Sequence, residues 1–397
     1  MLIFSKIVGR VIERIEVRPL MSIIFLLGMF SCIDPYYPHD TAGGKNVYVI
    51  EGTVTNESSR QIIRVSLASR IDKPQYTPVQ NCAVSIIDGQ GNVFGNINSG
   101  TTGEYYIDIP EQYLIPEAVF RLHVTTPSGY VFESETDTLK SSPPVDVLYY
   151  SISSGYNSEL REEIPGVQFK VDLKKLPTDS YFYRWKLTET YEYRSRYPIE
   201  YISDGVSTQR IYPPDYSLFY CWKTSEIRNL FLLSTKSLLG DEIKGFNLHF
   251  VDNRNVKLRY VYSLLVKQLA YTEASYGYLQ AIKDNNSSLG GLFDGQPVLV
   301  RGNISCTSDP SITTLGNFSV AAVTTSRFTF DKIEEDLPLS IIEGCIPRRL
   351  DRGFEEFSPS DFPVFFVKVG GALLYADKQC FDCTLLGGTN EKPTFLP

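Results

Sequence analysis

Seven cysteines are the residues of this chain whose chemistry depends most on spacing, and they stand at positions 32, 82, 221, 306, 345, 380 and 383. Cys380 and Cys383 form a Cys-x-x-Cys pair, a spacing that redox motifs and zinc sites both use. A redox motif needs a thioredoxin-like strand and helix, and a four-cysteine zinc site needs a second close pair; the Gly-rich tail offers neither. The pattern therefore favours structural disulfides over metal or redox chemistry, with one or two bridges among Cys306, Cys345, Cys380 and Cys383. Cys82 lies in a strand pattern and is expected to be a buried free thiol, and no metal or other cofactor is expected.

Histidines and paired carboxylates offer the other routes to catalysis. His123 and His249 lie inside alternating strand patterns, and no G-x-S-x-G nucleophile elbow accompanies them. Neither a P-loop nor a G-x-G-x-x-G nucleotide-binding motif occurs. Adjacent acids such as Glu162 and Glu163 are typical of solvated loops, whereas glycoside hydrolysis needs two carboxyl groups about 5–10 Å apart across a cleft. The sequence therefore predicts a protein that is not an enzyme.

Aromatic side chains gather between residues 191 and 222. The chain contains 26 Tyr and 23 Phe, and this Pro-containing stretch places Tyr, Trp and Arg together in a pattern with few strand signals. These three residue types are enriched at binding hot spots, and long loops on a β scaffold often carry recognition. The stretch is either a candidate binding surface or the outward face of a Tyr-rich sandwich. The candidate residues are Tyr191, Tyr193, Arg196, Tyr197, Tyr201, Tyr212, Tyr216 and Trp222.

Short alternating strands must position these residues. From residue 46 to 140 apolar residues alternate over short runs, and turn signals such as Asp88-Gly-Gln-Gly-Asn92 separate them, which predicts a β-sandwich. Residues 141–145 contain two prolines and read as a linker. Residues 146–397 predict a second, β-rich domain with a Cys-containing tail. A helix is expected near 272–284, capped by Thr272, with Ala274, Tyr278 and Ile282 on one face. The fold class is therefore mostly β.

The N-terminus predicts export. Four basic residues precede eleven apolar or small residues, Leu20 to Phe30, which are too few to span a bilayer. Cys32 follows at the end of a lipobox-like pattern, so residues 1–31 are expected to be a lipoprotein signal peptide and Cys32 the lipidated residue; a plain secretory peptide is the alternative. Residues 32–45 then form a tether. A net charge of −8 without a basic block argues against a nucleic-acid partner.

Several segments together resemble a known family. They include "YVIEGTVTNESSRQIIRVSLAS", "LFDGQPVLVRGNISC" and the ending "CFDCTLLGGTNEKPTFLP". These resemble the DUF4249 family of Bacteroidetes lipoproteins over nearly the whole chain from Cys32 onward. The segment "SGTTGEYYIDI" also resembles the carboxypeptidase-regulatory, Ig-like type of β-sandwich. The resemblance implies an outer-membrane lipoprotein, often encoded beside a TonB-dependent receptor.

Two functions are consistent with these observations. The first is an accessory binding lipoprotein that works with a TonB-dependent transporter in nutrient uptake, lipid-anchored in the outer membrane and expected at the cell surface. The second is a structural or adhesive cell-surface module without a transport role. A lipid anchor would confine the protein to the membrane plane and raise its effective concentration near a receptor there.

Overall fold

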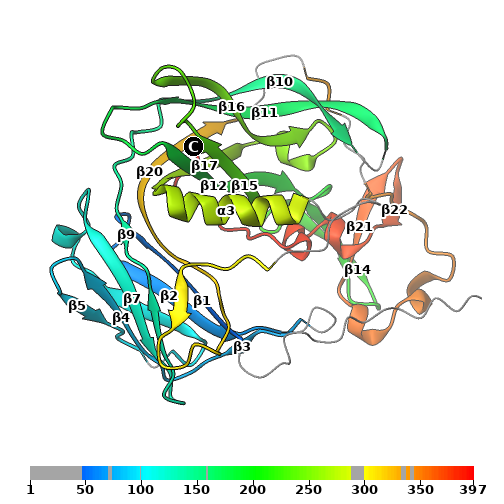
Figure 1. The fold of residues 1–397 in the computed structure, drawn as a ribbon. Helices are drawn as coiled ribbons and strands as arrows, with labels where there is room; N and C mark the ends of the chain where they lie inside the picture. The colour runs from blue at the N-terminus through cyan, green and yellow to red at the C-terminus, as the bar shows by residue number, and fades with distance from the viewer. Residues whose placement is uncertain are drawn as a thin grey trace, which may run out of the picture. The chain divides into compact units, whose positions relative to one another are not determined.

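The computed structural model describes residues 47–69, 74–98, 100–157, 160–287, 299–331, 337–339 and 344–397. The signal peptide, the lipidated Cys32 and the tether predicted for residues 1–45 lie outside them. The fold is mostly β, as predicted, with a single α-helix among the described residues (Figure 1). None of the described helices is both long and apolar enough to cross a bilayer.

An N-terminal sandwich is built from two layers of short strands. The alternation of apolar and polar residues decides which side chains enter it: Phe120, Leu122 and Val124 of β7 are buried and the residues between them are not. Tyr48 and Phe132, from opposite layers, approach to 4.8 Å between ring centroids. One layer contains β1 (Tyr48–Thr55), β2 (Arg60–Leu67), β3 (Thr77–Pro78) and β6 (Glu104–Asp108). The other contains β4 (Ala83–Asp88), β5 (Val93–Gly95), β7 (Val119–Thr125), β8 (Val131–Ser134), β9 (Asp137–Thr138) and β18 (Ile304–Cys306).

A second sandwich lies beyond the first. Its central layer contains long strands, in the order β15 (Tyr220–Ser234), β12 (Phe182–Arg194), β17 (Tyr262–Tyr271) and β20 (Phe318–Phe330). A three-stranded sheet covers one face, in the order β10 (Val147–Asn157), β11 (Glu162–Lys174) and β16 (Glu242–Asp252). Trp185 packs on Phe246 at 4.6 Å and Phe169 on Tyr262 at 5.2 Å between these layers. The strand predicted to include Leu258 begins only at β17, because residues 256–258 form the short 3-10 helix η2.

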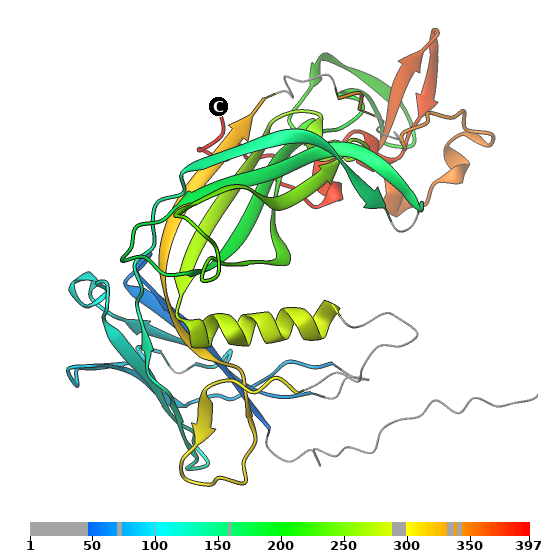
Figure 2. The ribbon, with the colours of Figure 1, turned by 45° about the horizontal axis from the view of Figure 1, so that its top comes forward.

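Strand β20 joins the two sandwiches into one structure. Its first residues pair in parallel with β1, from Phe318 opposite Gly52 onward, and its later residues pair with β17 (Figure 2). A nine-stranded sheet therefore runs through both sandwiches, with β19 (Thr314–Leu315) also pairing with β1. The sandwich predicted for 46–140 thus takes strands from beyond residue 300. Residues 46–397 form one compact unit.

The predicted linker at 141–145 packs into the second sandwich. The Gln268 side chain is fully buried, and its amide donates to the Pro143 carbonyl oxygen at 2.8 Å while its oxygen accepts from the Trp185 indole at 3.1 Å. A buried amide with partners for both its ends fixes the position of the chain that it touches. Pro143 therefore serves as an acceptor that anchors the connection between β9 and β10, and the segment is not a free spacer.

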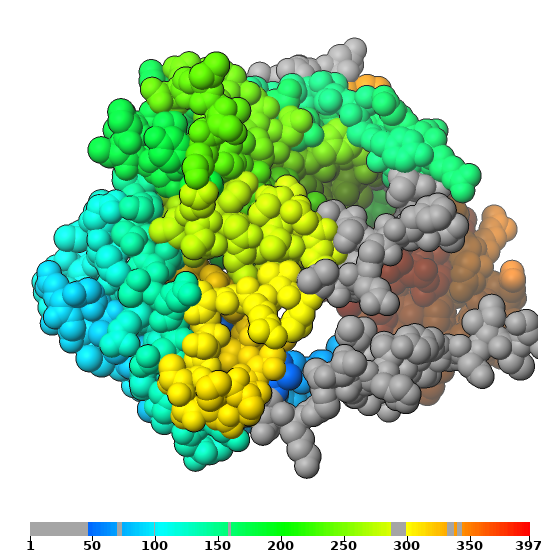
Figure 3. Space-filling view, in the orientation of Figure 1, coloured from blue at the N-terminus to red at the C-terminus, as the bar shows by residue number. Residues whose placement is uncertain are grey.

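Helix α3 (Glu273–Ser287) lies near the predicted position and ends three residues later. Thr272 caps it through its side-chain oxygen, which accepts from the Ser275 amide at 3.4 Å. Tyr276 packs on Phe182 at 5.1 Å and Ser275 is buried, whereas Ala274, expected on the packed face, is exposed. One side of α3 stays at the surface (Figure 3).

A four-stranded sheet extends from the far end of β12 and β15. Its order is β14 (Thr208–Asp215), β13 (Ile199–Ser203), β21 (Val364–Val369) and β22 (Ala372–Tyr375). The hairpin β13–β14 connects β12 to β15, and the C-terminal tail adds the other two strands. The short 3-10 helices are η1 (Glu111–Tyr113), η2 (Val256–Leu258), η3 (Gly353–Glu356), η4 (Pro359–Asp361), η5 (Lys378–Cys380) and η6 (Cys383–Leu386).

Candidate interaction surface

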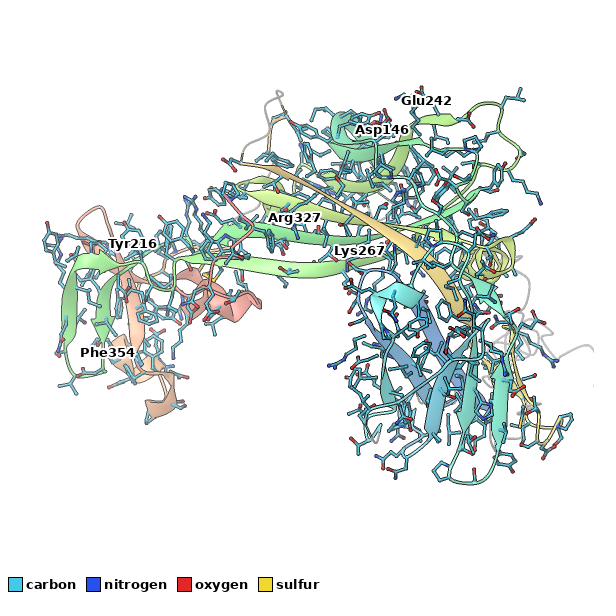
Figure 4. The ribbon with its side chains drawn as sticks, turned by 90° about the vertical axis from the view of Figure 1, so that its left-hand side faces the viewer. Asp146, Tyr216, Glu242, Lys267, Arg327 and Phe354 are labelled. Atoms are coloured by element: carbon cyan, nitrogen blue, oxygen red, sulfur yellow. A yellow bond between two sulfur atoms is a disulfide. The ribbon has the colours of Figure 1, made fainter. Side chains whose placement is uncertain are left out.

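The four-stranded sheet and the tail segment 344–397 form a unit that we call the extension; Tyr216 and Phe354 mark it in Figure 4. It has a small core of its own, in which Ile199, Ala376 and Phe381 are buried. Two β-strands of the tail could not hold this position alone, because a two-stranded hairpin is marginally stable in water. The tail therefore needs further attachments to the long strands.

Two disulfides supply them. Cys221, at the start of β15, pairs with Cys383, and Cys345 pairs with Cys380. The prediction of bridges among four C-terminal cysteines is confirmed for Cys345–Cys380 only. Cys306 is wrong as a bridge candidate, since it is a buried free thiol in β18, within the N-terminal sandwich and not on the tail.

The ending Gly387-Gly388-Thr389 closes the attachment. Thr389 exchanges two backbone hydrogen bonds with Trp222, at 2.8 and 2.9 Å. The Tyr193 hydroxyl donates to the Cys383 carbonyl oxygen at 2.8 Å, and a Cβ at position 388 would lie only 2.3 Å from that hydroxyl. Glycine is therefore required at 388, because any side chain there would collide with the end of β12.

The extension and the adjoining ends of β12 and β15 display aromatic rings and arginines at the surface. Tyr212 is 80% exposed, and the Arg210 guanidinium lies 5.3 Å from its ring centroid. Tyr216 stacks near Tyr220 at 6.3 Å, and Arg194 lies 5.0 Å from the Tyr220 ring. Arginine within about 6 Å of a tyrosine ring is a cation–π arrangement, which is attractive at exposed sites. We call Arg194, Arg210, Tyr212, Tyr216 and Tyr220 the Arg/Tyr surface.

The stretch 191–222 differs from the expectation of a strand-poor loop. It contains the last residues of β12, all of β13 and β14, and the first residues of β15. Regular strands therefore place its side chains on alternating faces. Tyr191, Tyr193 and Trp222 are buried, at 8%, 7% and 9% exposure, and are wrong as surface residues. Tyr191 and Tyr193 share the inward face of β12 with Trp185, which is why they are covered.

The remaining five candidates lie in or beside the extension. Tyr212 and Tyr216 are exposed, Tyr201 is half-buried beside Arg210, and Arg196 is exposed. Tyr197 is half-buried with its ring 5.7 Å from Phe381. Sequence reasoning missed Arg194, Arg210 and Tyr220. Each of them lies within four residues of a tyrosine in sequence: Arg194 follows Tyr193, Arg210 precedes Tyr212 by two residues, and Tyr220 follows Tyr216 by four. This closeness to tyrosines is the signal that would have found them.

A buried charge cluster lies between the layers of the second sandwich. The Glu189 side chain is 4% exposed, and its carboxylate accepts from Lys257 Nζ at 2.6 Å, Ser225 Oγ at 3.0 Å and Tyr262 Oη at 3.0 Å. The His249 imidazole lies 3.6 Å away. Burial tends to raise the pKa of this carboxyl, but the interactions with His249 and Lys257 outweigh it and lower the pKa of Glu189 to about 2.

This cluster is suited to holding the layers together and not to turning over a substrate. Every hydroxyl and amine that touches the carboxylate donates to it, so Ser225 is not activated as a nucleophile. At 4% exposure the carboxylate is also closed to a reactant. His123, the other candidate base, lies on β7 beside Glu133 at 3.1 Å. Both histidines occupy strands, as predicted, and no group of three metal-ligating residues occurs in the described part of the chain.

Comparison with known proteins places these features in a family. Residues 33–327 match the family described as "Domain of unknown function (DUF4249)". A comparison with curated proteins finds no match. The match covers both sandwiches and the first half of the extension and stops within β20. The chain belongs to the DUF4249 family.

Proposed function

We propose that this protein is a lipid-anchored binding protein of the outer membrane that docks a TonB-dependent transporter through its Arg/Tyr surface and assists nutrient uptake. The observation that carries the proposal is the exposure of arginines and tyrosines on the extension and the strand ends that join it, where two disulfides hold the tail in place. A rigid platform of this kind loses little conformational entropy on binding. The residue types are those that dominate binding energy at protein interfaces.

Further support comes from the other exposed apolar residues of the extension. Val206, Ile346 and Leu373 are 90%, 80% and 42% exposed, on the hairpin and tail that flank the Arg/Tyr surface. Apolar residues gathered around aromatic and arginine anchors are the composition expected at the centre of an interface. The Cys32 lipid proposed from the sequence would hold this surface at the membrane, where a transporter resides.

The test is affinity purification of the tagged protein from outer membranes, followed by mass spectrometry. The variant Arg210→Ala/Tyr212→Ala/Tyr216→Ala is compared with Tyr156→Ala, which removes a tyrosine 69% exposed on β10. We expect a transporter to be recovered with the wild type and with Tyr156→Ala and to be lost with the triple variant. Equal recovery with the triple variant, or recovery of no transporter, would contradict the proposal.

A further inference from the structure

A basic pocket lies on the face of the central layer opposite β11 and β16. It has a volume of about 510 Å³, within the range of small-molecule sites. Residues from β1, β2, β12, β15, β17 and β20 contribute to it, so both sandwiches take part. Lys267, one of its lining residues, lies near the bend between the two sandwiches in Figure 4. We call it the basic pocket.

The charge of the lining is opposite to the charge of the protein. Five lining residues are cationic and two, Glu57 and Glu226, are anionic, whereas the whole chain has a net charge of −8. Glu57 pairs with Lys267 at 2.7 Å. Among the described residues no carboxylate lies within ion-pair distance of Arg184, Lys186 or Arg228. Arg184, Lys186 and Arg228 therefore have no ion-pair partner in the part of the chain that the structure describes, and Glu226 is the one carboxylate of the lining that is not itself in an ion pair there.

Strand register brings these cations together. Lys186 of β12 stands directly opposite Lys267 of β17, on the same face of the sheet. Like charges directly opposite one another destabilise a sheet. Arg228 is one of three residues of β15 that bulge opposite Lys186, between the pairs Leu187–Ile227 and Trp185–Phe231. Bulges re-aim side chains and are enriched beside functional sites.

Arg184 provides a second sign that a partner is missing. Its Nε is buried and has no hydrogen-bond acceptor within the described parts of the chain. A buried donor of a charged group left without an acceptor is costly. Burial and the charge of Arg184 also lower the pKa of Lys186, although that residue is exposed as a whole. An oxyanion in the pocket would satisfy Arg184 and relieve the repulsion at Lys186.

We propose that the basic pocket binds a small polyanion, a molecule with two or more phosphate, sulfate or carboxylate groups, through Arg184, Lys186 and Arg228. Arginine binds such groups with two parallel N–H donors and lysine with a point charge. The pocket is distinct from the Arg/Tyr surface, so this inference does not rest on transporter docking. It concerns what the protein carries and not which partner it contacts.

Calorimetry on the full chain tests the proposal with sodium tripolyphosphate and sodium citrate, against sodium chloride at equal ionic strength. We expect saturable binding of at least one polyanion that weakens as salt increases. The variant Arg184→Gln/Lys186→Gln/Arg228→Gln should bind roughly 1,000-fold more weakly, because each of the three charged hydrogen bonds contributes roughly a factor of ten. The control Arg121→Gln/Lys174→Gln removes surface charge elsewhere and should bind like the wild type. Absence of polyanion binding by the wild type, or unchanged binding by the triple variant, would overturn the proposal.

Two further measurements test the site even if the triple variant does not fold. Lys186→Gln alone should raise the thermal midpoint without ligand and reduce the rise that tripolyphosphate causes. A lower midpoint without ligand would refute the repulsion argument. In the wild type, tripolyphosphate should protect Lys186 from acetylation and leave Lys174 unprotected, as mass spectrometry can measure. Equal acetylation of Lys186 with and without tripolyphosphate would likewise overturn the site.

Discussion

The buried Glu189 carboxylate yields a quantitative prediction for Glu189→Gln. The substitution keeps the size of the side chain but replaces one acceptor oxygen with an amide donor, beside the hydroxyl of Tyr262. It also leaves the Lys257 ammonium, 2.6 Å from the carboxylate in the wild type, without a counter-charge. Removing one member of a buried ion pair is among the more destabilising changes that a core can undergo.

The magnitude follows from the pKa. The folded state lowers the pKa of Glu189 from its ordinary 4.5 to about 2. A carboxyl group whose pKa is lower in the folded state than in the unfolded state stabilises the fold. This stabilisation is complete when the pH is above the pKa of the unfolded state, and it is lost as the pH falls through the pKa of the folded state. A shift of this size contributes about 3 kcal/mol at neutral pH. The stabilisation should therefore disappear between about pH 4.5 and pH 2, and less than half should remain at pH 3.

Urea denaturation from pH 7 to pH 3 measures this contribution. We expect Glu189→Gln to lower the free energy of unfolding by about 3 kcal/mol at pH 7, and the difference from the wild type to shrink on acidification. Glu162→Gln, at an exposed position of β11, is the matched control and should change stability by less than about 0.5 kcal/mol. A difference between wild type and Glu189→Gln that stays constant from pH 7 to pH 3 would refute the reasoning.

Two other predictions concern the attachments between distant segments. Cys221→Ala/Cys383→Ala removes a disulfide between residues separated by 162 positions in sequence and should lower the free energy of unfolding by up to about 5 kcal/mol. Urea denaturation measures this loss. The control Cys82→Ala removes a buried free thiol and should cost roughly 1 kcal/mol. Asp137 accepts from Ser275 Oγ at 2.7 Å and the Val320 amide at 2.8 Å, so Asp137→Asn should cost about 2 kcal/mol and speed amide exchange in α3. If the Cys221→Ala/Cys383→Ala variant were as stable as the wild type, the disulfide would not contribute to stability. If amide exchange in α3 were unchanged in Asp137→Asn, the Asp137 contacts would not hold the helix.

The parts of the fold that local patterning decides could be predicted from the sequence. The strand alternation around Phe120 and Trp185, the turn after Asp88 and the helix from Thr272 all depend on neighbouring residues, and the structure shows each of them. The pairing of β20 with both β1 and β17 could not be predicted, because strands distant in sequence pair by shape and register and no local signal specifies the partner.

The candidate site shows the same division. Residue types correctly drew attention to Tyr212 and Tyr216, but exposure depends on which face of a strand a side chain occupies. Tyr191 continues the inward alternation of Trp185 along β12, so its burial follows from a local pattern. The burial of Trp222 depends on the tail, which pairs with it at Thr389, and could not be read from composition. Cys221 was missed as the partner of Cys383 for the same reason, since 162 residues separate them in sequence.

Site-specific photo-crosslinking in intact cells tests transporter docking most directly. A photoreactive amino acid replaces Tyr212 on the Arg/Tyr surface or Tyr156 on β10, the two positions being 80% and 69% exposed. The proposed function predicts a crosslink from position 212 to a TonB-dependent transporter and none from position 156. Crosslinking to a transporter from position 156 alone, or from neither position, would contradict it.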